Sequence, residues 1–181
     1  MLRGVNVGGH NRLKMEELRA VYESLKLRDA CTYVQSGNVV FRSEEQNLLR
    51  LATQIEDAIE RRFGFRPDVI LRTAAELKDV IARNPFAKRA GVEPNKLLVL
   101  FLAHEPRSEA REKLLSLKTD PDELKLSGRE FYIYFPKGVG QSKLPAIIDR
   151  TLKSPATGRN WNSVLKMLAL AESLEASAAS R

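Results

Sequence analysis

A glycine-rich loop near the start of the chain holds the first residues suited to binding chemistry. It runs from Gly4 to Asn11 as Gly-Val-Asn-Val-Gly-Gly-His-Asn, between an apolar run and a helical pattern. Glycines let such a loop expose backbone N–H groups, which can hold an anion at the start of a helix. Positive charge is added by Arg3, His10, Arg12 and Lys14. The spacing matches neither the P-loop nor the dinucleotide fingerprint, so a tight turn is the alternative explanation.

Three further polar segments carry residue types that could hold a ligand: Gln35-Ser-Gly-Asn38, Lys137-Gly-Val-Gly-Gln-Ser-Lys143 and Thr157-Gly-Arg-Asn-Trp-Asn162. Lysines flank the second, and the arginine of the third offers a planar fork to phosphate or carboxylate. Each segment also has an ordinary structural explanation. The first fits an ordinary turn, and the second fits a strand–helix connection in which Ser142 caps the helix. The third fits a helix start capped by Asn160 or Asn162, with Trp161 in the core. The candidate ligand-binding residues are Arg3, Asn6, Gly8, Gly9, Gln35, Ser36, Asn38, Lys137, Gly138, Gly140, Ser142, Lys143, Arg159, Asn160, Trp161, Asn162 and Lys166.

Other site chemistries find little support in the sequence. The two histidines, His10 and His104, are far apart, and no spacing matches a zinc site. The single cysteine, Cys31, lies in a strand pattern and is predicted to be a small buried residue. No Ser/His/Asp arrangement stands out. We expect no metal and no cofactor, and the sequence names no catalytic residue, so whether the protein is an enzyme is left open.

The elements that must position these segments follow one order twice. Hydrophobic periodicity and turn signals predict β-α-β-β-α-β in each half, with a short helix between the halves and a final helix. An offset of 91 residues carries the hairpin turn Ser36-Gly37 onto Ser127-Gly128, which indicates an internal duplication. The expected strands are 2–5, 30–35, 39–42, 68–72, 97–102, 122–126, 130–135 and 156–159. The expected helices are 15–25, the segment from the capping box 43–46 to Gly64, 73–84, 107–117, 144–152 and 161–174.

The β-α-β-β-α-β unit is the ferredoxin-like plait, an antiparallel sheet with two helices on one face. We therefore expect an α+β protein made by tandem duplication of two ferredoxin-like subdomains plus a C-terminal helix. Residues 1–90 would form the first subdomain with its linker helix, and 91–181 the second with the final helix.

Composition is consistent with a globular, cytoplasmic protein. The 181 residues are 43% hydrophobic and 29% charged, no apolar run is long enough to span a bilayer, and no signal peptide is recognisable. The formal net charge of +7 is spread over both halves, so binding of nucleic acid is only weakly supported. The aromatic run Glu130–Phe135 raises the question of base stacking, with Phe131, Ile133 and Phe135 on one face and Tyr132 and Tyr134 on the other.

Together the motifs resemble the domain of unknown function 1697 family (DUF-1697) of mostly bacterial cytosolic proteins. The matching segments are Leu2-Arg-Gly-Val-Asn-Val-Gly-Gly9, Gln35-Ser-Gly-Asn-Val-Val-Phe41, Asn84-Pro-Phe86, Phe135-Pro-Lys-Gly-Val-Gly140 with Ser142-Lys-Leu144, and Arg159-Asn-Trp-Asn162 with Lys166. The resemblance covers nearly the whole chain. It implies two ferredoxin-like subdomains and no established activity. Relatives usually carry several apolar residues before the first motif, which complete the first strand. We therefore expect either a short first strand here or a start codon that was assigned too late.

Three functional hypotheses follow. The first is a small-molecule or anion-binding protein, with catalysis left open, whose site is built from the glycine loop, the hairpin tip and the Arg159–Asn162 segment. The second is a nucleic-acid-binding module, and the third is a structural or dimerising scaffold. The first requires the three polar motifs to converge. Converged, they would form either a pocket for an anion or a clasp in which polar groups satisfy one another.

Overall fold

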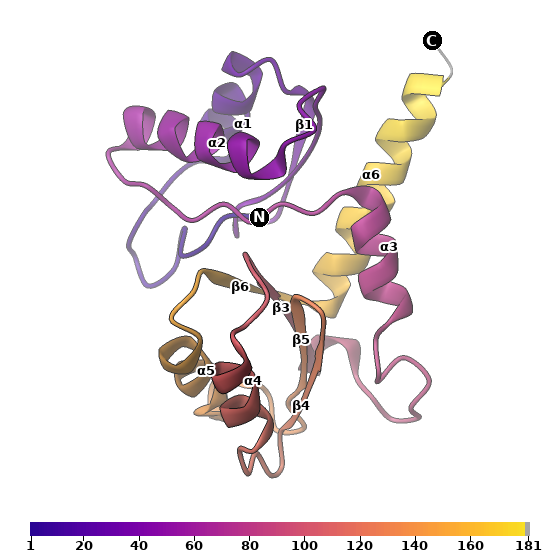
Figure 1. Cartoon of the computed structure of the whole chain (residues 1–181). Helices are drawn as coiled ribbons and strands as arrows, with labels where there is room; N and C mark the ends of the chain where they lie inside the picture. Colours follow the sequence, from indigo (N-terminus) through magenta and orange to yellow (C-terminus); the bar gives the residue numbers. More distant parts are fainter. Residues whose placement is uncertain (180–181) are drawn as a thin grey trace. The chain divides into compact units, whose positions relative to one another are not determined.

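The structure is a computed structural model that describes residues 1–179, and it has the predicted α+β class (Figure 1). Its helices are α1 (Met15–Ser24), α2 (Leu48–Phe63), α3 (Ala74–Ala82), α4 (Ser108–Leu115), α5 (Leu144–Leu152) and α6 (Trp161–Ala179). Its strands are β1 (Arg28–Tyr33), β2 (Asn38–Arg42), β3 (Leu97–Leu102), β4 (Glu123–Ser127), β5 (Glu130–Tyr134) and β6 (Ala156–Asn160). Single 3-10 turns lie at Pro94–Lys96 and Val139–Gln141.

The chain divides into two compact units, which are described separately. Unit 1 holds residues 1–74 and the chain from 166 onward, and unit 2 holds residues 75–165. These units differ from the predicted halves 1–90 and 91–181, because α3 belongs with the second sheet. The Tyr132 hydroxyl donates a 2.7 Å hydrogen bond to the Val80 carbonyl of α3. That the two halves arose by duplication stays a prediction.

Unit 2 is built on a four-stranded antiparallel sheet with the strand order β4-β5-β3-β6. Leu98 of β3 pairs with Ile133 of β5 on one side and with Asn160 of β6 on the other. The β4–β5 hairpin turns at Gly128, as the Ser-Gly signal predicted. Helices α4 and α5 cover one face of this sheet (Figure 1). The core between them contains Leu102, Leu114, Phe131, Ile133, Phe135, Leu144 and Ile148.

The other face of this sheet is covered too. The predicted alternation along β5 is confirmed, because Phe131, Ile133 and Phe135 join the α4–α5 core while Tyr132 contacts α3. Tyr132 is fully buried, and the buried Tyr134 ring lies 6.1 Å from the Phe86 ring. A base can stack only on an exposed aromatic face. These tyrosines therefore offer no platform for RNA.

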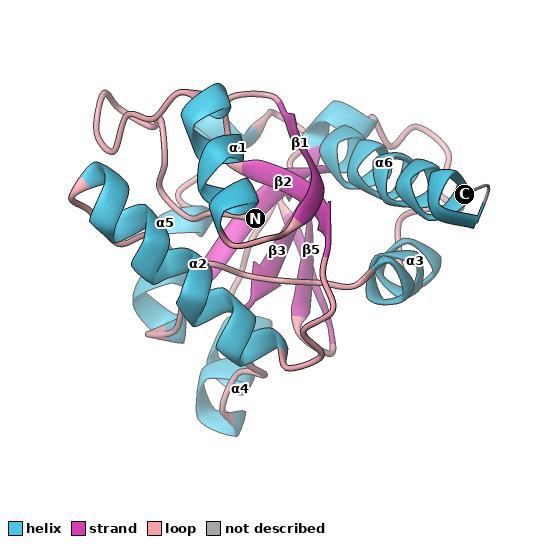
Figure 2. Ribbon diagram, turned by 90° about the horizontal axis from the view of Figure 1, so that it is seen from above, coloured by secondary structure: helices cyan, strands magenta, loops and turns pink. Residues whose placement is uncertain are grey.

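Unit 1 contains a two-stranded antiparallel sheet, β1–β2, with α1 packed against both β1 and α2 (Figure 2). The predicted strands 2–5 and 68–72 are wrong as full strands, since they meet only in a bridge between Leu2 and Val69. Two backbone bonds support that bridge, Arg3 N to Asp68 O and Ile70 N to Met1 O. The extended run cannot continue past Arg3, because Gly4 has φ +65° and turns the chain.

The observed helix ends can be compared with the start and stop signals predicted from the sequence. α1 begins at Met15 with Glu16 and Glu17 in its first turn, as predicted. The predicted capping box at 43–46 is wrong, because the cap of α2 is Asn47, whose side chain accepts from the N–H groups of Leu49 and Arg50. A box residue further upstream cannot reach these first free N–H groups. The predicted stop at Gly64 is confirmed by its left-handed φ of 76°.

Of the predicted core positions, Leu18, Ile55 and Ile148 are buried, whereas Phe63, Leu168 and Cys31 are only half-buried. Leu18, Ile55 and Ile148 are at most 1% exposed. Cys31 is only half-buried, because β1 has a single neighbouring strand and no residue of it is fully covered. Partial burial nevertheless raises the pKa of the Cys31 thiol, which lowers its thiolate fraction at neutral pH.

Tyr22 carries a hydroxyl with no hydrogen-bond partner in the described part of the chain. The side chain is 0% exposed and meets the Phe41 ring edge-on, 5.1 Å between centroids. Burial raises the pKa of this phenol, so it stays neutral. An unpaired buried hydroxyl costs about 1–3 kcal/mol. We therefore expect Tyr22→Phe to raise the free energy of unfolding by about 1 kcal/mol in urea denaturation.

Tyr132→Phe is the matched control for that measurement. Tyr132 is equally buried, but its hydroxyl donates to Val80, so its removal should lower the free energy of unfolding by about 1 kcal/mol. A loss of stability in Tyr22→Phe as large as that of the control would show that the Tyr22 hydroxyl has a bonded partner.

Candidate functional site

The first glycine loop follows its path because five of its residues are left-handed. The positive φ angles belong to Gly4, Asn6, Gly8, Gly9 and Asn11. Glycine adopts this conformation freely, and asparagine is the ordinary residue that tolerates it best. The turn requirement foreseen for Gly8 and Gly9 is therefore met. The same backbone requirement accounts for Asn6 and Asn11, of which the sequence analysis had chosen only Asn6, as a polar ligand-binding candidate.

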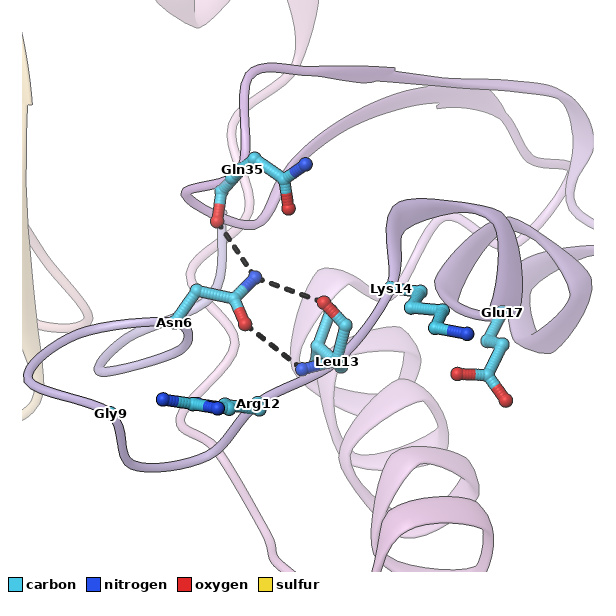
Figure 3. A pocket seen from close by; sticks show the side chains of 7 residues that line it. All are labelled: Asn6, Gly9, Arg12, Leu13, Lys14, Glu17 and Gln35. Atoms are coloured by element: carbon cyan, nitrogen blue, oxygen red, sulfur yellow. Dashed lines mark hydrogen bonds between the residues drawn. The ribbon is translucent and has the colours of Figure 1, made fainter.

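Asn6 fastens the glycine loop to the hairpin tip and to the start of α1 (Figure 3). Its Nδ2 donates to the Gln35 carbonyl at 2.9 Å and to the Leu13 carbonyl at 3.0 Å. Its Oδ1 accepts from the Leu13 N–H at 2.9 Å. An amide nitrogen has two protons and both are used here. Asn6 therefore fixes the loop and is not a free ligand group.

The hairpin tip is held just as firmly. Asn38 is fully buried and its Nδ2 donates to the Tyr33 carbonyl and to Ser36 Oγ. Val34 is left-handed at φ 53°, a strained conformation for a β-branched residue. Ser36 and Asn38 thus hydrogen-bond each other, while Gln35 is exposed and its backbone carbonyl faces Asn6 of the glycine loop (Figure 3).

A pocket of about 540 Å³ opens between the loop, the hairpin tip and the first turn of α1. It is lined by Asn6, Gly9, Arg12, Leu13, Lys14, Glu17 and Gln35 (Figure 3). Arg12 and Lys14 form no ion pair or hydrogen bond with any residue in the described range 1–179. Glu17 pairs with Arg62 of α2 at 3.0 Å. The pocket therefore presents two cations without an ion-pair partner among residues 1–179.

Sequence reasoning found part of this lining. Asn6, Gly9 and Gln35 were candidates, and Arg12 and Lys14 were recognised as adding positive charge without being chosen as site residues. Leu13 and Glu17 were missed as pocket residues. Glu17 had a signal, since its place in the first turn of α1 sets it beside any ligand at the helix start. Leu13 had none, because an apolar residue before a helix normally belongs to the core, as its 5% exposure confirms.

Arg3 lies apart from this lining. Its Nη1 pairs with Asp68 Oδ2 at 3.3 Å, next to the backbone bond from Arg3 N to the Asp68 carbonyl. Both side chains are about two-fifths exposed, at 38% and 41%. The pair reinforces the bridge between Leu2 and Val69, and Arg3 is therefore a structural residue.

The second glycine loop, in unit 2, is occupied by its own contacts. The N-cap residue of α5 is Lys143 and not Ser142 as predicted, although Ser142 Oγ accepts from Leu144 N at 3.0 Å and donates to Asp122 Oδ2 at 2.5 Å. Lys137, Gly140 and Lys143 are exposed, and Gly138 takes φ 87°. The Asp122 carboxylate beside the helix start repels anions, which disfavours a phosphate there.

The Thr157–Asn162 segment is also largely accounted for within unit 2. Arg159 is 7% exposed, and its Nη1 donates to Thr157 Oγ1 and to the Gly158 carbonyl, each at 2.7 Å. Burial lowers its pKa to about 10, so it stays charged at neutral pH. Asn160 caps α6 by accepting from Ser163 N at 2.8 Å.

The remaining candidates of that segment are not core anchors. Trp161 is only half-buried, which differs from the expected anchor role, and Asn162 and Lys166 are exposed. Of the three motifs expected to converge, the structure brings the glycine loop and the hairpin tip together in unit 1. Their convergence with the Arg159–Asn162 segment stays a prediction.

Fold and pocket together define a small α+β protein with a basic pocket beside a left-handed glycine loop. The chain belongs to the family described as "Protein of unknown function (DUF1697)", whose model matches residues 1–132. That match includes every pocket residue and ends before the second glycine loop and the Arg159–Asn162 segment.

The structure is similar to that of the conserved bacterial protein SP0830 from Streptococcus pneumoniae. The TM-score is 0.70 at 21% sequence identity, over 94% of this chain and 96% of that one. At this identity the likeness shows a shared fold and says nothing of a ligand. No curated protein sequence matches the chain. Within residues 1–179, no helix is long and apolar enough to cross a bilayer.

Proposed function

We propose that unit 1 binds a small anionic molecule in the pocket beside the glycine loop. The observation that carries this proposal is the pair Arg12 and Lys14, which line the pocket without a protein partner in the described range. Five other arginines of the unit are engaged by carboxylates, in the pairs Arg3–Asp68, Arg28–Glu44, Arg42–Asp29, Arg62–Glu17 and Arg66–Glu56.

The surroundings of the two cations favour an anion as well. Arg12 offers a planar fork of N–H donors, and Lys14 is the N-cap residue of α1, at the positive end of the helix dipole. Among the described residues, none accepts a hydrogen bond from the N–H of Gly8 or Gly9. A volume of about 540 Å³ also suits a small molecule, since such sites typically measure about 300–1,000 Å³.

The pocket is formed before any ligand arrives. Asn6 ties three chain segments together, and Val34 is held in a conformation that costs about 1–3 kcal/mol. Strain of this kind persists only where the surrounding structure enforces it. A loop fixed in this way loses little conformational entropy on binding, which increases the affinity obtainable from a few contacts.

We expect Arg12→Ala to weaken binding of inorganic phosphate by about 10- to 100-fold, because a charged hydrogen bond contributes about 1.5–3 kcal/mol. Isothermal titration at low salt measures this directly. Arg61→Ala is the matched control, since Arg61 is an exposed arginine of the same unit without a partner in the described range and lies outside the pocket lining.

Three results would contradict the proposal: no phosphate binding by the wild type, equal loss in both variants, or no loss in Arg12→Ala. Salt-dependent binding of a generic single-stranded oligonucleotide, unaffected by Arg12→Ala, would instead favour the nucleic-acid alternative, because phosphate contacts release counterions.

We further propose that the two halves of the chain descend from one ferredoxin-like plait. The support is the element order β-α-β-β-α-β with the sheet order β4-β5-β3-β6 in unit 2. In unit 1 the Leu2–Val69 bridge stands where the first and last strands would pair, and Leu2 N donates to the Gly37 carbonyl beside β2. A superposition of residues 1–72 on 96–160 tests this descent.

A further inference from the structure

We infer that the ligand of the glycine-loop pocket is a phosphomonoester that carries hydroxyl groups, such as a sugar phosphate, and not a polyphosphate. The inference rests on the proposed function and adds the class of ligand. It follows from three features of the lining: the number of free cations, the position of one carboxylate, and the position of one amide.

The number of cations sets the charge of the anionic group. Arg12 and Lys14 supply two positive charges, and Arg62 pairs with only one oxygen of the Glu17 carboxylate. A phosphomonoester carries about −1.5 to −2 at neutral pH, whereas a carboxylate carries about −1. The phosphomonoester therefore matches the two free cations more closely. Its three oxygens can also accept from the Arg12 fork and from the N–H groups of the glycine loop.

The Glu17 carboxylate excludes a second phosphate. Only one of its oxygens, Oε1, accepts from Arg62, and the other has no partner in the described range. Glu17 lines the pocket at the first turn of α1, on the side of Lys14 that lies away from Arg12 (Figure 3). An added phosphate near this oxygen would be repelled, whereas a hydroxyl would donate a hydrogen bond to it.

The Gln35 amide supplies the complementary polar contact. Its backbone carbonyl is used by Asn6, but its exposed side chain has no partner in the described range and borders the pocket from the hairpin tip (Figure 3). An amide donates and accepts, so it pairs with a hydroxyl in either direction. Hydroxyl-binding groups in the same lining as two free cations fit a phosphorylated polyol.

Isothermal titration with three probes tests this inference: inorganic phosphate, ribose-5-phosphate and pyrophosphate. We expect ribose-5-phosphate to bind about 10-fold more tightly than inorganic phosphate, as for one or two added hydrogen bonds. Pyrophosphate should bind no more tightly than inorganic phosphate. Glu17→Gln should abolish the preference for ribose-5-phosphate over pyrophosphate. Glu16→Gln, the adjacent exposed acid of the same helix turn, should leave it unchanged.

The outcomes distinguish a failure of the proposed anion site from a failure of the proposed ligand class. If none of the probes binds, the proposed function fails. If inorganic phosphate binds through Arg12 but ribose-5-phosphate gains nothing, or pyrophosphate binds most tightly, the ligand class is wrong and the anion site stands. If Glu17→Gln and Glu16→Gln change the preference equally, the effect is general charge and the assigned role of Glu17 is wrong.

Discussion

Gly37→Ala is expected to lower the free energy of unfolding by about 2–5 kcal/mol. Gly37 sits in the hairpin tip with φ +72°, where a side chain costs about 1–2 kcal/mol. An added Cβ would also lie 2.7 Å from Val5 Cγ2 and 2.8 Å from Leu2 Cβ. Both neighbours are at most 2% exposed and have no room to move, so overpacking adds about 1–3 kcal/mol. Urea denaturation followed by circular dichroism measures the loss.

Gly64→Ala separates the steric part of this loss from the conformational part. Gly64 lies in the same unit with φ +76°, and a Cβ there would meet nothing within 4 Å. We expect it to lose only about 1 kcal/mol. Equal losses at the two positions would show that the hairpin tip does not press against Leu2 and Val5 as the structure has it.

Asn6 variants should have the second largest effect, on stability and on the pocket together. Asn6→Gly keeps the left-handed backbone but removes three hydrogen bonds, so we expect a loss of about 1–3 kcal/mol. Asn6→Asp keeps the acceptor for Leu13 N but sets a carboxylate against the carbonyls of Leu13 and Gln35. That repulsion should make the aspartate variant at least as unstable as the glycine variant, and both should bind phosphate more weakly.

Asn11→Gly is the control for these variants. Asn11 has the same left-handed backbone, at φ 48°, but makes a single exposed side-chain bond, to the Gly4 carbonyl at 3.1 Å. We expect its replacement to cost under about 1 kcal/mol. If Asn6→Gly cost no more than Asn11→Gly, the three-way bond network of Asn6 would not hold the loop to the hairpin.

Local pattern predicted the second unit almost residue by residue. The bounds of β3 and α5 agree with the expected 97–102 and 144–152, because a continuous apolar run and a helical repeat each specify one structure. The first unit was harder to predict from local pattern. Leu2–Val5 has the composition of a strand, but the left-handed Gly4 ends it. Strand propensities do not show which single residue will turn the chain.

Two of the polar segments that the sequence singled out, the glycine loop and the hairpin tip, are joined in the structure through Asn6. That they form a binding site stays a prediction. The side-chain amides of Asn6 and Asn38 are already hydrogen-bonded within unit 1, whereas the Arg12 guanidinium and the Lys14 ammonium have no partner in the described range. A sequence lists donors without showing which of them the fold already satisfies, so structural and ligand-binding polar residues look alike until the hydrogen bonds are known.

The division of the chain bears on the order in which it can fold during synthesis. Unit 2 is one continuous stretch, residues 75–165, whereas unit 1 combines residues 1–74 with the chain from 166 onward. A ribosome releases the chain from its N-terminus, so the earlier-numbered unit receives its last segment after unit 2 is fully synthesised. Until α6 emerges, residues 1–74 lack that partner, and the glycine loop and its hairpin belong to a unit that is still incomplete.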